Sequence, residues 1–244
     1  MTKEELVTLD VAYMLSKVLP ALLLAVPTSL LLLATSGVIG NILAVPVALA
    51  RLSRNPLLWL PAYAFIMLMR GTPLLVQIYL VYYGLGQILP AGAMRALPFL
   101  RDGIWYAIFA LSINTAGYTG EILRGAILAV PHGEIEAARA FGMSRWLVLR
   151  RVTLPVAIRI CLPAMSSEMI LLLKATSLAS TVTVYEVLGT AQAIRVDTFR
   201  VYDTLLGAAI VYVAMVYLLT RVLNWIERSL SRDRRPLPTA PVPA

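Results

Sequence analysis

The sequence predicts an all-α integral membrane protein with five transmembrane helices, on the basis of its composition and of the length and continuity of its apolar runs. Of the 244 residues, 59% are hydrophobic and only 14% are charged, whereas soluble domains carry about 25% charged residues. A helix needs about 20 residues to span the hydrocarbon core. The runs are continuously apolar rather than alternating, which excludes a transmembrane β-barrel. Four runs of 17 to 33 residues contain no charged side chain: 18–50, 71–94, 103–120 and 204–220.

The five expected helices are separated by polar or proline-containing segments. The first run is longer than the bilayer requires, so either its helix tilts or its first portion lies at the interface. Gly37 and Gly40 give this helix a small-residue packing face. Arg70 interrupts the second helix, and Glu168 and Lys174 interrupt the fourth. The expected helices cover 21–50, 57–88, 104–123, 160–185 and 205–226.

The distribution of Lys and Arg predicts which helix ends face the cytoplasm, because cytoplasmic loops carry an excess of positive charge. With the N-terminus outside, the inner segments 51–56, 124–159 and 221–244 hold 13 of these residues, whereas the outer segments 1–17, 89–102 and 186–204 hold 6. The chain is therefore expected to divide into three parts: an N-terminal periplasmic segment at 1–20, a transmembrane domain at 21–227, and a cytoplasmic, basic and proline-rich tail at 228–244.

Scarce and absent residue types exclude several kinds of chemistry. Cys161 is the single cysteine and His132 the single histidine, so no intrachain disulfide and no cysteine- or histidine-based metal site can form. The phosphate-binding pattern GxxxxGK followed by Ser or Thr does not occur, so any ATP must be bound by another polypeptide. The net charge of +8 does not indicate nucleic acid, because the arginines lie just beyond the apolar runs. We expect no cofactor in this chain.

A charged, helix-forming segment between two apolar runs predicts a helix-turn-helix outside the bilayer. Residues 133–141 are rich in strong helix formers, and Gly142 supplies the left-handed residue that ends the first helix. Ser144 can cap a second short helix that runs through Arg151. Leu154-Pro155 is expected to stop that helix, because the residue before proline avoids the α region. An element held at both ends by membrane helices suits docking against a soluble partner.

The same segment resembles the EAA loop of ABC-importer permeases. That motif has Glu-Ala-Ala, three residues, Gly, nine residues and then an aliphatic residue, any residue, Leu and Pro; it is matched from Glu136 to Pro155, with Val152 in place of the usual isoleucine. The resemblance covers about residues 20–227 and is greatest to the branch that handles histidine, lysine, arginine, octopine and nopaline. Four further segments resemble polar amino-acid permeases: RGTPLLVQ at 70–77, YYGL at 82–85, NTAGYTGE at 114–121 and VPHGEIE at 130–136.

The resemblance implies the type I ABC importer permease fold in the bacterial inner membrane, in contact with lipid. This chain would be one of two permease subunits, identical or homologous, that act with P-loop ATPase subunits and a periplasmic substrate-binding protein. The ATPase subunits would bind ATP and Mg, so this chain is not itself an enzyme. Within the implied coupling loop 131–155, Ile135, Ala138 and Phe141 recur every three residues and are expected to form a buried stripe. The implied coupling residues are Glu134, Ile135, Glu136, Ala137, Ala138, Phe141, Gly142 and Pro155.

Polar residues inside the spans mark a candidate substrate pathway, because such residues are costly in a membrane and indicate function. Glu168 either contacts the ammonium or guanidinium of a cationic substrate or forms a structural ion pair with Arg70 or Lys174. Arg70 either donates to carbonyls freed by a helix break at Gly-Thr-Pro or meets a substrate carboxylate. The Ser/Thr-rich stretch of the fourth helix either lines the pathway or joins helices. Glu121 is expected to pair with Arg124. The candidate pathway residues are Arg70, Gln77, Asn114, Glu168, Lys174, Ser177 and Ser180.

Other membrane functions fit the sequence less well. A gradient-driven secondary amino-acid transporter is the main alternative, but such folds usually have inverted repeats and more spans. A membrane enzyme would need clustered histidine, cysteine or acidic residues. A channel or scaffold would not need a docking helix-turn-helix with glycine at its turn. The sequence therefore favours a subunit of an ATP-driven importer.

Overall fold

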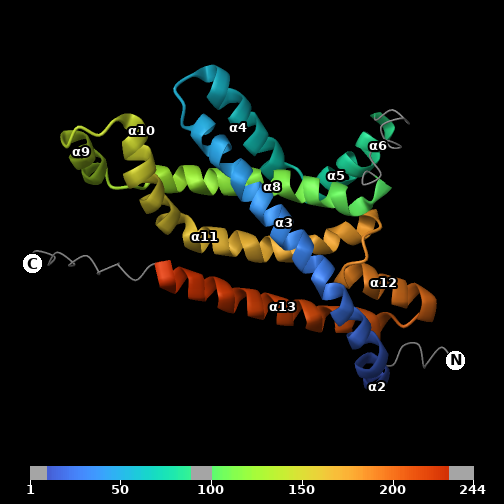
Figure 1. The fold of residues 1–244 in the computed structure, drawn as a ribbon. Helices are drawn as coiled ribbons and strands as arrows, with labels where there is room; N and C mark the ends of the chain where they lie inside the picture. Colours follow the sequence, from blue (N-terminus) through green and yellow to red (C-terminus); the bar gives the residue numbers. More distant parts are fainter. Residues whose placement is uncertain (1–9, 89–100, 231–244) are drawn as a thin grey trace, which may run out of the picture.

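The computed structural model describes residues 10–88 and 101–230, and every regular element within these ranges is a helix (Figure 1). The all-α prediction is thereby confirmed. The first long helix joins α2 (Val11–Tyr13), a π-helical turn (Met14–Val18) and α3 (Leu19–Arg51), so it begins well before the expected residue 21. The other elements are α4 (Pro56–Gly71), α5 (Leu74–Tyr79), a π-helical turn (Leu80–Gly84), α6 (Leu85–Ile88), α8 (Gly103–Leu128), α9 (His132–Ala140), α10 (Arg145–Val148), a π-helical turn (Leu149–Thr153), α11 (Leu154–Ala175), a 3-10 helix (Thr176–Val182), α12 (Val187–Thr198) and α13 (Val201–Leu230).

The long helix α3 runs diagonally across α8, α11 and α13 (Figure 1). Small residues permit its closest approach to α8. A Cβ added at Gly40 would lie 2.6 Å from Thr115 Cβ, and one added at Gly120 would lie 3.0 Å from Val47 Cγ1. The small-residue packing face predicted for the first helix is therefore present, since close backbone approach replaces side-chain interdigitation at this crossing.

The expected second helix, 57–88, is broken rather than continuous. α4 ends at Gly71, and the segment Leu74–Gly84 leaves it at an angle of 108°. Thr72 is extended, with φ −112° and ψ 145°, and it precedes Pro73. A residue before proline is pushed away from the α region, and Pro73 itself has no N–H to continue the helix. The helix break considered at Gly-Thr-Pro is therefore confirmed, and the helix expected over 57–88 divides there because this local stop outweighs the apolar character of the run.

The expected stop at Leu154-Pro155 is absent. The chain stays helical from Arg145 to Val182, through a π-helical turn in which Leu154 N donates to Leu149 O, five residues earlier. Such a turn widens the backbone and makes room for the Pro155 ring, which then lies in the first turn of α11. The fourth helix ends at Val182, because Thr183 adopts a left-handed conformation with φ 66°.

Three described helices are long and apolar enough to cross a membrane: Val11–Arg51, Arg145–Val182 and Val201–Ser229. The bent pair Pro56–Gly71 and Leu74–Gly84 adds a fourth if it forms one span. α8 has 26 residues but is not among these helices; it lies largely buried in the bundle and carries Glu121 and Arg124. The predicted count of five spans is therefore not confirmed.

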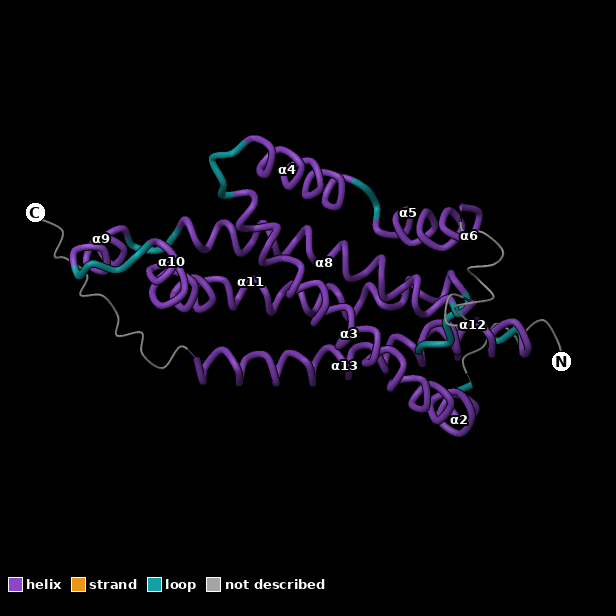
Figure 2. Tube along the Cα trace, turned by 45° about the horizontal axis from the view of Figure 1, so that its top comes forward, coloured by secondary structure: helices purple, strands orange, loops and turns teal. Residues whose placement is uncertain are grey.

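Segments predicted to share one side of the membrane lie together at the two ends of the molecule (Figure 2). At one end, α9 and α10 lie near the turn between α3 and α4, and Arg54, Arg139 and Arg145 line one hollow there. At the other end, Arg200 Nη1 lies 3.0 Å from Asp10 Oδ2. The predicted outer loop 186–204 is instead mainly α12, a helix that was not predicted from the sequence. Most of the predicted outer segment 89–102 and of the tail 228–244 lies outside the described residues.

Candidate functional site

A polar cluster closes the break between α4 and α5. Pro73 has no N–H, so the Met69 carbonyl four residues earlier loses its helical donor. Gln77 Nε2 donates to Met69 O at 3.0 Å, and Asn114 Nδ2 donates to the same oxygen at 3.2 Å. Asn114 Nδ2 also donates to Gln77 Oε1 at 2.9 Å, and Gln77 Nε2 donates to Thr72 Oγ1 at 2.8 Å. These two amides, both predicted as pathway residues, supply the donors that the broken helix requires.

Arg70 does not serve as that donor. Its guanidinium lies over the ring of Tyr118, with Cζ 5.5 Å from the ring centroid. Tyr118 lines a cavity of about 170 Å³ between the α4–α5 break, α8 and α11, and Asn114 and Glu168 line the same cavity. Four of the predicted pathway residues therefore lie at or near one small cavity. Asn114 and Glu168 line it. Arg70 contacts the cavity-lining Tyr118, and Gln77 is hydrogen-bonded to Asn114.

The Glu168 carboxylate is the unusual group in this cavity. It is half-buried and forms no hydrogen bond or ion pair with another described residue. Arg70 acts on it only through space, and neither Arg70 nor Lys174 lies within ion-pair distance of it. The structural ion pair considered from the sequence is thus not formed in this structure. A carboxylate held in a bundle without a protein partner is available to a cationic ligand.

The remaining pathway candidates lie apart from this cavity. Lys174 is exposed. Ser177 Oγ donates to the Lys174 carbonyl at 2.7 Å, where α11 passes into the 3-10 helix. Ser180 lines a different cavity, of about 510 Å³, formed mainly with α12. Its hydroxyl is buried and has no partner among the described residues. The predicted pathway therefore separates into a central cavity and a second hollow near one end.

The helix-turn-helix matches the prediction in its first helix and its turn. Gly142 has φ +76°, and its N–H donates to Arg139 O at 2.9 Å, which caps the end of α9. Ser144 Oγ accepts from Leu147 N at 3.4 Å and caps α10, as expected. The predicted pair of Glu121 and Arg124 is also present, with Arg124 Nη2 2.6 Å from Glu121 Oε1.

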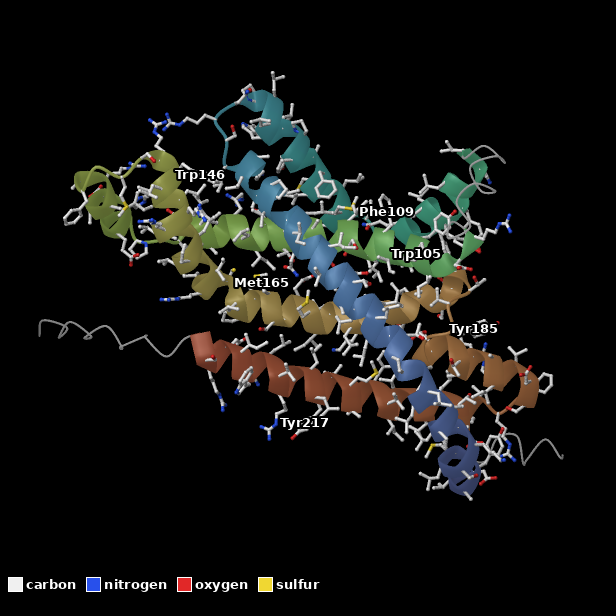
Figure 3. All side chains as sticks on the ribbon, in the orientation of Figure 1. Trp105, Phe109, Trp146, Met165, Tyr185 and Tyr217 are labelled. Carbon is white, nitrogen blue, oxygen red and sulfur yellow. The ribbon has the colours of Figure 1, made fainter. Side chains whose placement is uncertain are left out.

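The expected buried stripe on α9 is correct at two positions and wrong at the third. Ala138 is buried, and Ile135 packs against the apolar cluster that joins α3, α8 and α11. Phe141 is 86% exposed, because the helix ends one residue earlier and the chain turns away from the bundle. Trp146 on α10, which was not among the predicted coupling residues, is 64% exposed, and its side chain is labelled in Figure 3. The other proposed coupling residues, Glu134, Glu136, Ala137 and Pro155, are exposed as well.

A fully buried glutamate was also missed. Glu186 has no exposed surface, and its carboxylate accepts from Tyr212 Oη at 2.6 Å, Gly189 N at 2.7 Å, Leu188 N at 3.0 Å and Ser29 Oγ at 3.3 Å. It therefore caps α12 and ties that helix to α3 and α13. An acidic residue directly before a helix is a capping signal. It could have identified Glu186 as a capping residue only if α12 had been predicted as a helix.

Apolar helices of membrane-spanning length, an unpaired carboxylate among them and an exposed helix-turn-helix define a helical membrane transport component. The sequence profile of the family described as "binding-protein-dependent transport system inner membrane component" matches residues 40–236, and the chain belongs to this family.

Relatives and solved structures agree with this assignment. The octopine transport system permease protein of Rhizobium meliloti is 46% identical over 215 residues, which cover 88% of each chain. The histidine/lysine/arginine/ornithine transport system permease protein of Salmonella typhimurium is 41% identical over 204 residues, covering 83% of this chain and 87% of the relative. A crystal structure of an amino acid ABC transporter with histidines is similar with a TM-score of 0.79 and 31% identity, over 91% of this chain and 99% of that one. The type I importer permease fold and the predicted branch of the family are thus confirmed.

Proposed function

We propose that this chain is the transmembrane subunit of an ATP-driven importer that moves cationic amino acids or opines across the bacterial inner membrane. The relatives are permeases of systems for octopine and for histidine, lysine, arginine and ornithine. The observation that carries the substrate class is the Glu168 carboxylate, which borders a cavity and has no partner among the described residues. An ammonium or guanidinium group would supply the missing positive charge, and the Arg70 guanidinium, which lies over the cavity-lining Tyr118, would attract a substrate carboxylate.

The helix-turn-helix is the element through which ATP hydrolysis in a partner would reach this cavity. The chain has no P-loop, so the ATPase subunits would bind ATP and Mg, and this chain would not itself be an enzyme. Phe141 and Trp146 expose large apolar surfaces beside the Gly142 turn, which suits docking into a soluble partner. Because Arg145–Val182 is one continuous helical segment, a push on the loop is transmitted along the helix that carries Glu168.

The proposed orientation follows from the charges. The end that holds α9, α10 and the turn between α3 and α4 would face the cytoplasm, with the C-terminus on that side and the N-terminus in the periplasm. The opposite end, with α12 and the hollow around Ser180, would face the periplasmic substrate-binding protein. A second permease subunit, identical or homologous, would complete the transport path.

Copurification with a matched pair of variants tests this proposal. The tagged chain is extracted from its native membranes in mild detergent, and every chain that accompanies it is identified; a P-loop ATPase is expected. Gly142→Asp adds a side chain at a φ that favours glycine and a charge at the proposed docking turn. It is expected to abolish ATP-dependent uptake and to reduce the copurifying ATPase.

Gly133→Asp is the control for this experiment. It adds the same residue to the same loop, in the first turn of α9, where nothing lies within 4 Å of the new Cβ and a negative charge is favoured. This variant is expected to keep both the ATPase and uptake. A chain that purifies alone and transports in ATP-free vesicles under an ion gradient would refute the proposal and favour a secondary transporter.

A further inference from the structure

Three arginines from separate segments converge on one hollow at the end of the molecule that carries the helix-turn-helix. Arg54 comes from the turn between α3 and α4, Arg139 from the last turn of α9, and Arg145 from the start of α10. Together they line a hollow of about 470 Å³. All three side chains are exposed, and none forms an ion pair or hydrogen bond with another residue in the described part of the chain.

Three like charges around one hollow repel each other, and an anion between them would remove that repulsion. The planar guanidinium group presents paired N–H donors that match the oxygens of a phosphate. Because the three arginines come from three different segments, the bound anion would also bridge the turn between α3 and α4 to both helices of the helix-turn-helix. The geometry therefore fits a compact anionic group such as a phosphate.

Neighbouring residues indicate that this anion belongs to a lipid. The Arg51 guanidinium lies over Tyr63 and Trp59, at 4.7 and 5.5 Å from the ring centroids, and tryptophan and tyrosine are enriched at the level of the lipid headgroups. Just beyond Arg54, Leu57 is 80% exposed and Leu58 is 51% exposed. Leu57 and Leu58 lie at the start of a helix that belongs to a candidate membrane span, so a phospholipid matches the arginines through its phosphate and these leucines through its acyl chains.

We propose that the hollow formed by Arg54, Arg139 and Arg145 binds the phosphate of an anionic phospholipid, with the acyl chains running along the first turns of α4. Basic pockets beside transmembrane helices on the cytoplasmic side recognise anionic headgroups through the same chemistry. The bound lipid ties the helix-turn-helix to the membrane surface and holds it beside the turn between α3 and α4. This contact does not depend on which substrate the protein carries.

Lipid binding to the full chain, purified with the subunits that accompany it, tests the proposal. The delipidated protein is titrated with phosphatidylglycerol and with phosphatidylcholine of identical acyl chains, and bound lipids are counted by native mass spectrometry. The wild type is expected to prefer phosphatidylglycerol. The triple variant Arg54→Gln, Arg139→Gln, Arg145→Gln is expected to weaken phosphatidylglycerol binding about tenfold or more and to leave phosphatidylcholine binding unchanged.

The matched control is a second triple variant, Arg150→Gln, Arg151→Gln, Arg159→Gln. It removes the same amount of charge from exposed arginines that follow the Gly142 turn in the sequence but do not line the hollow. This variant is expected to keep the preference for phosphatidylglycerol. Equal losses in both triples would refute the proposal in favour of diffuse surface charge. Unchanged lipid binding in the first triple, with loss of a copurifying ATPase, would overturn it in favour of an acidic protein partner.

Inorganic phosphate distinguishes the two possible sources of the anion. Excess inorganic phosphate is expected to weaken phosphatidylglycerol binding only slightly, because it lacks the acyl chains that contact α4. Complete displacement of the lipid by free phosphate would overturn the assignment to a lipid. ATP-dependent uptake by the wild type is measured separately, so a failure of the lipid site leaves the proposed transport function intact.

Discussion

Two glutamates lie within the helix bundle, and their surroundings are opposite. Glu186 is fully buried, and its carboxylate accepts hydrogen bonds from four groups on α3, α12 and α13. Glu168 is half-buried at the edge of a cavity and has neither a hydrogen bond nor an ion pair with a described residue. The protein supplies hydrogen-bond donors to the Glu186 carboxylate, whereas the Glu168 carboxylate is available to a bound ligand.

The difference distinguishes structure from function. A buried charge is tolerated when donors replace the water it has lost, and the donors around Glu186 meet this requirement. Glu168 lacks such donors among the described residues, yet it lines the same cavity as Tyr118, whose ring carries the Arg70 guanidinium, and the broken helix borders this cavity. The polar groups at that break, Gln77 and Asn114, are themselves satisfied. The unsatisfied group of the cavity is therefore the one that a substrate would engage.

Removal of the Glu186 side chain is expected to have the largest effect on the stability of the protein. Glu186→Ala leaves Tyr212 Oη and the Leu188 and Gly189 N–H groups without their acceptor, which costs roughly 3 kcal/mol. The thermal unfolding temperature in detergent is expected to fall by several degrees, and the yield of folded protein to fall with it. Glu186→Gln keeps the shape of the side chain but replaces one accepting oxygen by an NH₂ group that cannot accept a hydrogen bond. The unfolding temperature is therefore expected to fall by an intermediate amount.

The same truncation at the other glutamate sharpens the comparison. Glu168→Ala removes a carboxylate that has no partner within residues 10–88 and 101–230, so the unfolding temperature is expected to stay close to that of the wild type. If Glu168→Ala destabilised the protein as much as Glu186→Ala, the two sites would not differ in the proposed way. Side-by-side melting curves for the two variants decide this point.

Glu168→Gln is expected to impair transport rather than folding. The loss of a charge–charge contact in a confined site costs about 2 kcal/mol, which corresponds to a roughly thirtyfold rise in the apparent KM for cationic substrates. Uptake of radiolabelled arginine into proteoliposomes containing the complete transporter and ATP provides the measurement. Glu227→Gln, on α13 and outside the cavity, is the control and is expected to transport normally. Unchanged uptake kinetics in Glu168→Gln would remove this carboxylate from the substrate site.

The sequence predicted the features that depend on local chemistry or composition. The helical class follows from uninterrupted apolar runs, and the turn at Gly142 follows from the need for a left-handed residue after α9. The pairing of Glu121 with Arg124 follows from their spacing on one helix. Arg70 and Glu168 were recognised because ionisable residues stand out in an apolar span, although their partners were left open.

Features that depend on tertiary contacts were missed. α12 lies in a segment of mixed polarity, and its first turn is held by Glu186 together with Ser29 and Tyr212 from distant helices. Pro155 was expected to end a helix, but the preceding π-helical turn accommodates its ring. Phe141 was assigned to a buried stripe because spacing alone does not reveal that the helix ends before it.

A third carboxylate, Asp10, is intermediate between the two glutamates and is expected to show the smallest effect. Its side chain is 42% exposed, yet it accepts from Tyr13 N at 3.0 Å and from Arg200 Nη1 at 3.0 Å. The Tyr13 N–H, and next the Arg200 guanidinium, hold the pKa of Asp10 below its ordinary value of 3.8. Because the folded-state pKa is depressed, the stabilisation is present above pH 4 and is lost as the pH falls through the folded-state pKa.

Asp10→Asn removes the charge and hence this pH dependence. We expect its unfolding temperature to lie slightly below that of the wild type near neutral pH. The gap between the two should narrow as the pH falls below about 4, because the wild-type carboxyl then becomes protonated as well. Melting curves in detergent across this range provide the measurement. A gap that stays constant down to pH values well below the ordinary pKa would mean that the Asp10 charge does not hold the N-terminal helix to Arg200.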